Sequence, residues 1–420
     1  MNRLKDTIKY SLMRPLWRRF KKTKVGAAIQ RKRVRNRLDR IFSHEMPAVY
    51  NSEVDKPIQE NKVIFIEPRY NFLSNNFSRL YTELKKNKNL DIHIHYLLEL
   101  HVSKSEFSEK CKDMLRDMAT AKYVFINEAS RYVSCVSLRE ETIVTQLWHG
   151  CGAFKRFGFS TAGKIFGSEG ESLVRHPFYK NYTNVIISSP EVAWAYEEAM
   201  GLEDRPEVIK PIGVSRTDSF FSDEEKEKAR VKLEALMPVA KGKKVILFAP
   251  TFRGRVFSAK TPDNLSIEQF ADAFSDEYIL LFKHHPFVKK RPPIPARFEN
   301  SFARDMTEDM TIDELLFVSD ICISDYSSLV FDYSLLERPM LFFAYDLEEY
   351  FDWRGFYYDY NELTPGPICK TNEEMIDYIQ NIDAVFDKQE VIDFRNKFMS
   401  ACDGHATERI IKTVFGEAQD

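Results

Sequence analysis

The sequence predicts an α/β protein in which two doubly wound, Rossmann-like domains face a cleft, preceded by a basic helical arm. Short apolar runs alternate with amphipathic stretches, which is typical of βαβ units and parallel sheets. A charged stretch at 222–236 interrupts this alternation once, after which it starts again. The 420 residues suffice for two domains of ordinary size. We therefore expect the arm at 1–45, a first domain at 46–220 and a second domain at 221–420.

Positive charge is concentrated in the arm, and the rest of the chain is acidic. Residues 1–42 contain 15 Lys or Arg and two acids, so this segment carries +13 and the remainder −15. Apolar residues recur every four positions, with an interruption at Pro15: Leu4, Ile8, Leu12, Leu16 and Phe20. This pattern favours a helix lying on an anionic membrane surface. One alternative is a basic helix packed on the protein's own acidic body. Another is nucleic-acid binding by the run 31–37, but no RNA-binding signature accompanies it, and we expect no nucleic-acid partner.

The apolar runs predict the strands of each domain. In the first domain they lie at 62–66, 91–96, 121–126, 143–148 and 184–188, and a helix is expected at 74–86. Ser222 is the expected N-cap of an exposed linker helix that ends at Leu236. In the second domain the runs lie at 244–249, 278–283, 320–323 and 338–343.

Several function classes are disfavoured by what the sequence lacks. It has no run of 18 apolar residues, so no transmembrane helix is predicted, and no secretory signal is evident. The six cysteines are scattered, which favours reduced cytosolic thiols over disulfides or a zinc site. There is no P-loop, H-E-x-x-H or D-x-D motif, so we expect no P-loop ATP hydrolysis and no obligatory metal or cofactor.

Polar residues follow the predicted strands at their carboxyl ends, where ligands bind in open α/β sheets. His149 follows 143–148 and is a candidate general base, with a structural histidine as the alternative. Gly150 and Gly152 would let the backbone approach a ligand closely. Their spacing does not match the dinucleotide fingerprint.

Two strand ends in the second domain carry cationic or imidazole side chains. Arg253 can hold a phosphate through its planar fork, or it can be a surface residue. His284 and His285 point in different directions on an extended backbone, which does not suit one metal ion. One of them could donate to a phosphate while the other packs.

The segment 324–332 places Ser327 and Ser328 at the start of a helix. Hydroxyls and free backbone N–H groups at such a position favour a phosphate. Asp332 lies one turn beyond Ser328 and could accept hydrogen bonds from ribose hydroxyls. N-capping without any ligand is the alternative.

Longer motifs occur in the order known from one family of transferases. They lie at 146–150, 249–253, 285–286, 324–328, 331–333, 338–347, 354–357 and 365–367. The turn at 213–218 is similar to that family's G-x-P-R-x-D, with Ser215 in place of proline. Over roughly residues 60–415 the chain resembles the CDP-glycerol:poly(glycerophosphate) glycerophosphotransferases, which build teichoic acids and some capsules.

The resemblance implies a GT-B fold whose first domain binds the acceptor and whose second domain binds the CDP-linked donor. By match, His149 is the base that takes the proton from the acceptor hydroxyl, and His285 is the second catalytic histidine. The implied donor-binding residues are Arg253, His285, Ser327, Ser328 and, for the ribose, Asp332. Further candidates for acceptor binding or an accessory role are Lys155, Arg216 and Asp325.

The implied reaction transfers glycerol phosphate from CDP-glycerol to a hydroxyl of a lipid-linked or polymer acceptor, and it releases CMP. It would take place at the inner face of the bacterial cell membrane. Many members read Thr-Pro-Leu where this chain has 151–154, which leaves CDP-ribitol open as the donor. The chain also lacks the large N-terminal extension of the long polymerases, so a primase or a short polymerase stays open. The alternatives are a GT-B glycosyltransferase using a CMP- or UDP-sugar and a non-catalytic protein that binds anionic lipid.

Overall fold

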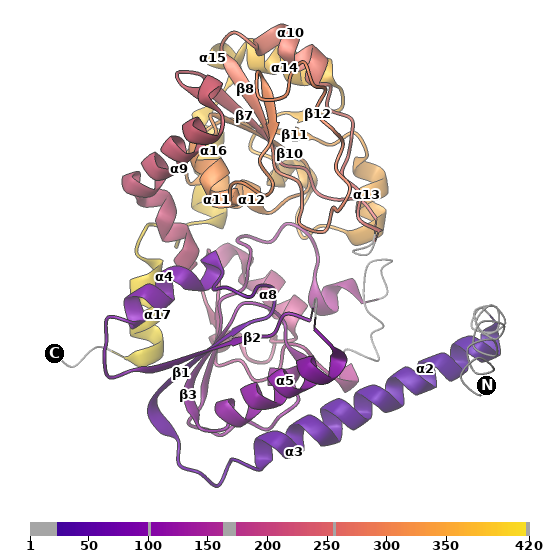
Figure 1. Ribbon diagram of the computed structural model, residues 1–420, viewed down its shortest axis with the longest axis vertical. Helices are drawn as coiled ribbons and strands as arrows, with labels where there is room; N and C mark the ends of the chain where they lie inside the picture. The colour runs from indigo at the N-terminus through magenta and orange to yellow at the C-terminus, as the bar shows by residue number, and fades with distance from the viewer. Residues whose placement is uncertain (1–22, 100–101, 163–173, 255–257, 417–420) are drawn as a thin grey trace, which may run out of the picture.

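The computed structural model describes residues 23–99, 102–162, 174–254 and 258–416, and these form two parallel sheets, one in each domain (Figure 1). The first sheet has the order β2-β1-β3-β4-β5-β6, and the second has the order β12-β11-β10-β7-β8-β9. The strands of the first are β1 (Gln59–Glu67), β2 (Asp91–Tyr96), β3 (Ala121–Ile126), β4 (Ile143–Gln146), β5 (Asn184–Ile186) and β6 (Ile209–Lys210). Those of the second are β7 (Lys244–Phe248), β8 (Tyr278–Phe282), β9 (Ala303–Asp305), β10 (Ile321–Ser324), β11 (Met340–Phe343) and β12 (Ile368–Cys369).

Helices and short 3-10 segments lie between the strands. In the first domain they are α4 (Asn75–Leu84), α5 (Lys104–Met118), α6 (Arg131–Ser134), η2 (Gly158–Thr161), η3 (Pro190–Val192), α8 (Ala193–Met200), η4 (Pro206–Val208) and η5 (Ser215–Phe221). In the second they are α9 (Asp223–Leu236), η6 (Pro238–Ala240), α10 (Ile267–Phe274), α11 (Ile312–Val318), α12 (Leu329–Ser334), α13 (Leu347–Arg354), η8 (Tyr360–Leu363), α14 (Asn372–Gln380), α15 (Ile382–Val385) and α16 (Lys388–Phe398).

The expected strands are confirmed, and their burial explains why they were visible in the sequence. Residues 63–66 of β1 are all buried, because a parallel sheet is covered on both faces and therefore needs a continuous apolar run. The Ser222 cap is also confirmed, since its side chain accepts from the backbone N–H of Glu225. Strands β6, β9 and β12 were not predicted, because two or three residues are too few to show any pattern.

Each sheet has one point where the strand order reverses, and such switch points are where open α/β sheets bind ligands. In the first sheet it lies between β1 and β3, where Ile66 is aligned with Ile126. In the second it lies between β10 and β7, where Ile323 is aligned with Phe248. The residues that follow each of these strand pairs are therefore brought side by side.

The last helix, α17 (Ala406–Phe415), departs from the predicted division at residue 220 because it returns to the first domain. Ile410 and Val414 are buried in the same cluster as Val63 of β1. Asp218 fixes the start of the helix by accepting from the backbone N–H groups of Ala406 (2.9 Å) and Thr407 (2.8 Å). The period of an amphipathic helix shows that it has a buried face but not which sheet that face covers, so the sequence could not reveal this return.

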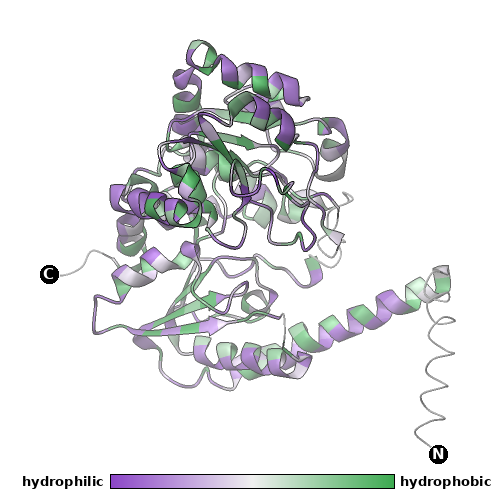
Figure 2. Cartoon of the chain, turned by 45° about the horizontal axis from the view of Figure 1, so that its top comes forward, coloured by the Kyte–Doolittle hydropathy of each residue, from purple (hydrophilic) through white to green (hydrophobic). Residues whose placement is uncertain are grey.

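The arm consists of α2 (Lys24–Asp39), the π-helical turn η1 (Arg40–Glu45) and α3 (Met46–Asn51). The apolar repeat predicted between Leu4 and Phe20 lies outside the described residues. Helix α2 extends away from the body, with hydrophilic and hydrophobic residues intermixed along it (Figures 1 and 2). Among the residues described, no helix is both long enough and apolar enough to cross a membrane.

Most of α2 is exposed, so its described part does not pack on the acidic body as one alternative required. Even the apolar Val25 is 63% exposed. The arm is attached where α2 ends, because Asp39 accepts from Arg175 Nη2 (2.9 Å) and lies 2.8 Å from His176 Nε2. Phe42 then packs edge-on against Tyr132.

Candidate active site

The predicted base, His149, follows β4 and is held by a carboxylate that the sequence analysis did not single out. Its Nδ1 lies 2.9 Å from Oε1 of Glu128, which follows β3, and Arg69 pairs with the same carboxylate. Burial opposes ionisation of Glu128, yet His149 and Arg69 hold its pKa below the usual 4.5. Nδ1 donates its hydrogen bond to the backbone oxygen of Asn127, with the Glu128 carboxylate beside it as an ion-pair partner, so the Nε2 lone pair is available to accept a proton.

Glu67, the last residue of β1, organises the loops around this pair. Its carboxylate accepts from the backbone N–H groups of Arg69 (3.0 Å) and Ser74 (3.3 Å) and from the side-chain amide of Asn127 (3.2 Å). The backbone oxygen of Asn127 lies 3.4 Å from His149 Nδ1. The residues after β1 and β3, at the switch point, thus surround the histidine that follows β4.

The loop after His149 is fitted against the second domain. Gly152 has φ +63°, and a Cβ at this position would lie 2.4 Å from the Phe331 ring of α12. At Gly150 a Cβ would lie 3.4 Å from Oγ of Ser328. We expected these glycines to let the backbone approach a ligand. The structure corrects this for Gly152, whose lack of a side chain makes room for Phe331.

Arg253 is occupied by carboxylates of its own domain. Its guanidinium donates to Asp346 (2.6 and 2.9 Å) and to Asp325 (2.9 Å), and it lies 5.0 Å from the ring centre of Tyr326. Burial disfavours the charge, but the two carboxylates raise the pKa of Arg253 above its usual value. Arg253 therefore anchors this end of the sheet, and its contact with a diphosphate stays a prediction.

Asp325, which had no firm role in the sequence analysis, joins the ends of β7 and β10. It accepts from the backbone N–H groups of Thr251 (2.8 Å) and Tyr326 (2.6 Å), and from the Thr251 hydroxyl. These bonds, together with the one from Arg253, leave Asp325 fully engaged. It orients the turn at the second switch point.

Ser327 and Ser328 lie where they were expected, directly before α12. Ser327 Oγ accepts from the backbone N–H of Leu329 at 3.4 Å, whereas Ser328, at the cap position, makes no capping bond. The hydroxyl of Ser328 is thus not used to cap the helix, and Gly150 of the first domain lies beside it. Diphosphate binding by the two serines stays a prediction.

The two adjacent histidines differ in their surroundings. His284 is buried, lies 2.9 Å from the Thr261 hydroxyl and has its pKa lowered by burial. His285 is half-buried, with its ring against Phe252 and Phe287. Its Nδ1 accepts from the backbone N–H of Phe287 (3.2 Å), so a neutral His285 carries its proton on Nε2. His284 is therefore the packing histidine, and the donor role assigned to His285 stays a prediction.

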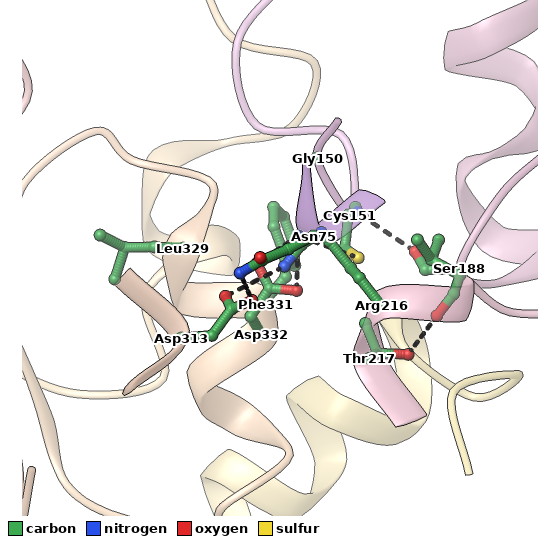
Figure 3. Close-up of polar contacts among 12 residues, drawn as sticks. Asn75, Gly150, Cys151, Ser188, Arg216, Thr217, Asp313, Leu329, Phe331 and Asp332 are labelled. Carbon is green, nitrogen blue, oxygen red and sulfur yellow. Dashed lines mark hydrogen bonds and ion pairs between the residues drawn. The ribbon is translucent and has the colours of Figure 1, made fainter. Parts of the chain in front are cut away.

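Asp332 and Arg216 form a buried ion pair between the domains. Nη2 of Arg216 lies 2.8 Å from each carboxylate oxygen of Asp332, and Nη1 lies 3.6 Å from Asp313 of α11 (Figure 3). Asn75 of the first domain donates to Asp313 at 2.9 Å. Burial raises the pKa of Asp313. In this arrangement the Asp332 oxygens are committed to Arg216, and Arg216 lies inside the interface rather than on an acceptor-binding surface.

Lys155 also crosses to the second domain. Its backbone pairs with Phe356, and its ammonium lies 5.9 Å from the ring centre of Tyr350, which in turn contacts Arg253. It therefore reaches the Arg253–Tyr350 contact of the second domain rather than a site confined to the first domain.

Glu67, Arg69 and Glu128 are the site residues that the sequence analysis missed. Each lies at or directly after the carboxyl end of a predicted strand, so the rule that selected His149 could have selected them too. A cavity of about 370 Å³ lies elsewhere in the first domain. It is lined by residues that include Lys62, His95 and Asp117, and it shares none with the site.

Comparison with known proteins gives this site its context. The family model for CDP-Glycerol:Poly(glycerophosphate) glycerophosphotransferase matches residues 48–416. The teichoic acid poly(ribitol-phosphate) polymerase of Bacillus spizizenii is 36% identical over 361 residues, which cover 85% of this chain and 56% of that protein. This chain thus spans a little over half the length of that relative.

Shorter relatives match over most of their length. The teichoic acid ribitol-phosphate primase of the same organism is 33% identical, with 84% of this chain and 90% of that protein covered. Its teichoic acid glycerol-phosphate primase is 28% identical, with 75% and 77% covered.

The structure of the wall teichoic acid polymerase TagF superposes with a TM-score of 0.72 at 21% identity, covering 94% of this chain and 98% of that one. This likeness confirms the predicted GT-B-like fold. From the match over residues 48–416 and the agreement in fold, the chain belongs to the CDP-Glycerol:Poly(glycerophosphate) glycerophosphotransferase family.

Proposed function

We propose that the protein transfers a polyol phosphate from a CDP-activated donor to a hydroxyl of a lipid-linked or polymer acceptor, releasing CMP, in teichoic acid or capsule synthesis. The observation that carries the proposal is the His149–Glu128 pair, 2.9 Å apart at the edge of the first sheet. The loop that continues from it lies against Ser328 at the second switch point. A base on the acceptor side thus meets hydroxyls on the donor side.

In the proposed reaction, His149 Nε2 takes the proton of the acceptor hydroxyl while Glu128 stabilises the imidazolium. The acceptor oxygen attacks the β-phosphorus of the donor, and the bond to the bridging oxygen breaks. CMP leaves with that oxygen and the polyol phosphate stays on the acceptor. His285 Nε2–H, Ser327 and Ser328 are the proposed donors to the diphosphate, where alignment and charge stabilisation supply the rate.

A separate question is which polyol the CDP-activated donor carries. CDP-glycerol is the donor that the family description suggests, and a TagF variant structure was obtained with CDPG. The chain is more similar in sequence to the ribitol-phosphate polymerase and primase than to the glycerol-phosphate primase. This similarity supports CDP-ribitol as the other candidate donor.

The test is a donor panel of CDP-glycerol, CDP-ribitol, a CMP-sugar and a UDP-sugar with a lipid-linked acceptor, in which CMP release and product mass are measured. We expect CMP from one CDP-polyol and none from the His149→Ala variant. Turnover with a nucleotide-sugar alone would show a glycosyltransferase. No turnover with any donor would overturn the proposal.

The arm is proposed to hold the protein on anionic membrane at the inner face of the cell membrane. The exposed basic residues of α2 support this: Arg31, Lys32, Arg33, Arg35 and Arg37. No acidic residue precedes Asp39 in the helix, so its field is uniformly positive.

A further inference from the structure

Two exposed aromatic rings lie on the loop that joins β1 to α4. Tyr70 is 36% exposed and Phe72 is 57% exposed, and their ring centres are 4.9 Å apart at an interplanar angle of 32°. Large apolar side chains grouped at the surface commonly mark a binding surface, because burial would otherwise stabilise the fold. No step proposed above uses this Tyr70–Phe72 pair.

The loop that carries the pair is fixed at both ends. Glu67 accepts from the backbone N–H groups of Arg69 and Ser74, so its carboxylate holds the two ends of the loop together. Immediately afterwards, Asn75 donates to Asp313 of the second domain at 2.9 Å. The loop that carries the rings is therefore a rigid connection between β1 and α4, at the edge of the first sheet that faces the second domain (Figure 1).

The pair is also linked to the proposed base. Arg69, the residue before Tyr70, pairs with Glu128, and Glu128 lies 2.9 Å from His149. An acceptor whose hydroxyl gives its proton to His149 has to lie along this edge of the sheet. The Tyr70–Phe72 pair is thus connected to His149 through Arg69 and Glu128.

We propose that the Tyr70–Phe72 pair binds a saccharide unit of the acceptor, a proposal that rests on the function proposed above. One face of a pyranose ring presents C–H groups that can pack on aromatic rings while its hydroxyls stay in water. A polyol-phosphate chain fits less well, because its anionic groups are repelled by the negative face of an aromatic ring. A bilayer also fits less well, because the only cation of the loop, Arg69, is already paired with Glu128.

Binding is tested without donor, by saturation-transfer NMR and titration with a short soluble saccharide and, separately, with an oligo(polyol phosphate). In the Tyr70→Ala/Phe72→Ala variant we expect saccharide affinity to fall by about tenfold or more, with the ring C–H signals lost. Affinity for the oligo(polyol phosphate) should stay within twofold. Tyr70→Phe should retain saccharide binding, since it keeps the ring. Phe221→Ala, which removes an exposed aromatic ring elsewhere, is the matched control.

Turnover measurements distinguish the saccharide subsite from the transferase function on which it rests. CMP release to water, measured without acceptor, should be unchanged in the double variant, while KM for a saccharide-bearing acceptor rises. If wild type binds the saccharide but turns over no donor, the proposed function fails and the subsite stands. The subsite would be overturned if the double variant lost affinity equally for the saccharide and the oligo(polyol phosphate), or lost affinity for neither. A loss of vesicle binding in place of saccharide binding would also overturn it.

Discussion

The guanidinium of Arg216 and the carboxylate of Asp332 meet across the domain boundary, with both carboxylate oxygens 2.8 Å from one nitrogen and Asp313 as a second acid nearby. One buried cation thus serves two carboxyl groups. The pair holds η5 to α12, directly behind the serines that precede that helix.

Loss of either partner should destabilise the protein, but unequally. Arg216→Met leaves two buried carboxyl groups without a cation and should cost about 3–5 kcal/mol of unfolding free energy. Asp332→Asn leaves Arg216 with Asp313 and should cost about 1–3 kcal/mol. Urea unfolding of both variants measures this. An Asp332→Asn protein of unchanged stability whose KM for the donor rises would instead support the predicted ribose contact.

Glu128→Gln should lower kcat by about 10²–10⁴-fold, because it removes the charge that orients His149 and stabilises its protonated form. Donor KM should change little, and Glu128→Asp should recover part of the rate. Steady-state CMP release gives all three values. A loss confined to KM would assign Glu128 to substrate binding instead.

The same carboxylate should contribute to stability in a defined pH range. Its pKa in the folded protein lies below the usual 4.5, so its stabilising effect is complete above that pH. The effect is lost as the pH falls through the lower folded value. Unfolding free energy measured between neutral and acid pH should therefore fall less steeply in Glu128→Gln than in wild type. Parallel curves would contradict this.

Gly152→Ala should be destabilising for two reasons, a left-handed backbone and a clash with Phe331. We expect a loss of about 2–5 kcal/mol in unfolding free energy. Gly242 is the matched control, because it has φ +77° but nothing within 4 Å of an added Cβ. Gly242→Ala should cost only the backbone term of about 1–2 kcal/mol. If the two variants lose equal stability, the clash does not matter.

Charge on α2 should control vesicle binding. Replacing Arg31, Lys32 and Arg37 with Gln should weaken binding to anionic vesicles by about 10²-fold, at about 1 kcal/mol for each basic residue near the surface. Added salt should weaken wild-type binding in the same direction. Three lysines outside the arm serve as the control when changed to Gln: Lys226 and Lys228 of α9, and Lys241, which follows η6. Equal losses in both triple variants would argue against a specific role for α2.

The sequence was sufficient for the two sheets, because each central strand is a continuous apolar run such as 63–66 and each ends in polar residues. It also predicted that His149 and the two serines directly follow strands, and the structure has them after β4 and β10. The sequence could not show which of these polar side chains are already paired with other residues of the protein. Arg253 and Asp332 have the chemistry of ligand-binding residues, yet they are held by Asp346 and by Arg216 from distant parts of the chain.

The same limit explains the glycines and the missed acids. Whether Gly152 faces a ligand or Phe331 depends on the packing of two domains, which local sequence does not encode. Glu67 and Glu128 also follow predicted strands, but only the parallel register of β1 and β3 shows that the ends of these two strands lie side by side.

The return of α17 to the first sheet makes the second domain an insertion, entered after η5 and left before α17. Two segments of the chain therefore connect the domains, and any movement of one domain against the other has to bend both. Such motion is a hinge rotation about the line through these two connecting segments. Removing the last helix would therefore expose part of the first sheet, around Val63 near the opposite end of the chain, while the inserted domain keeps all of its own strands.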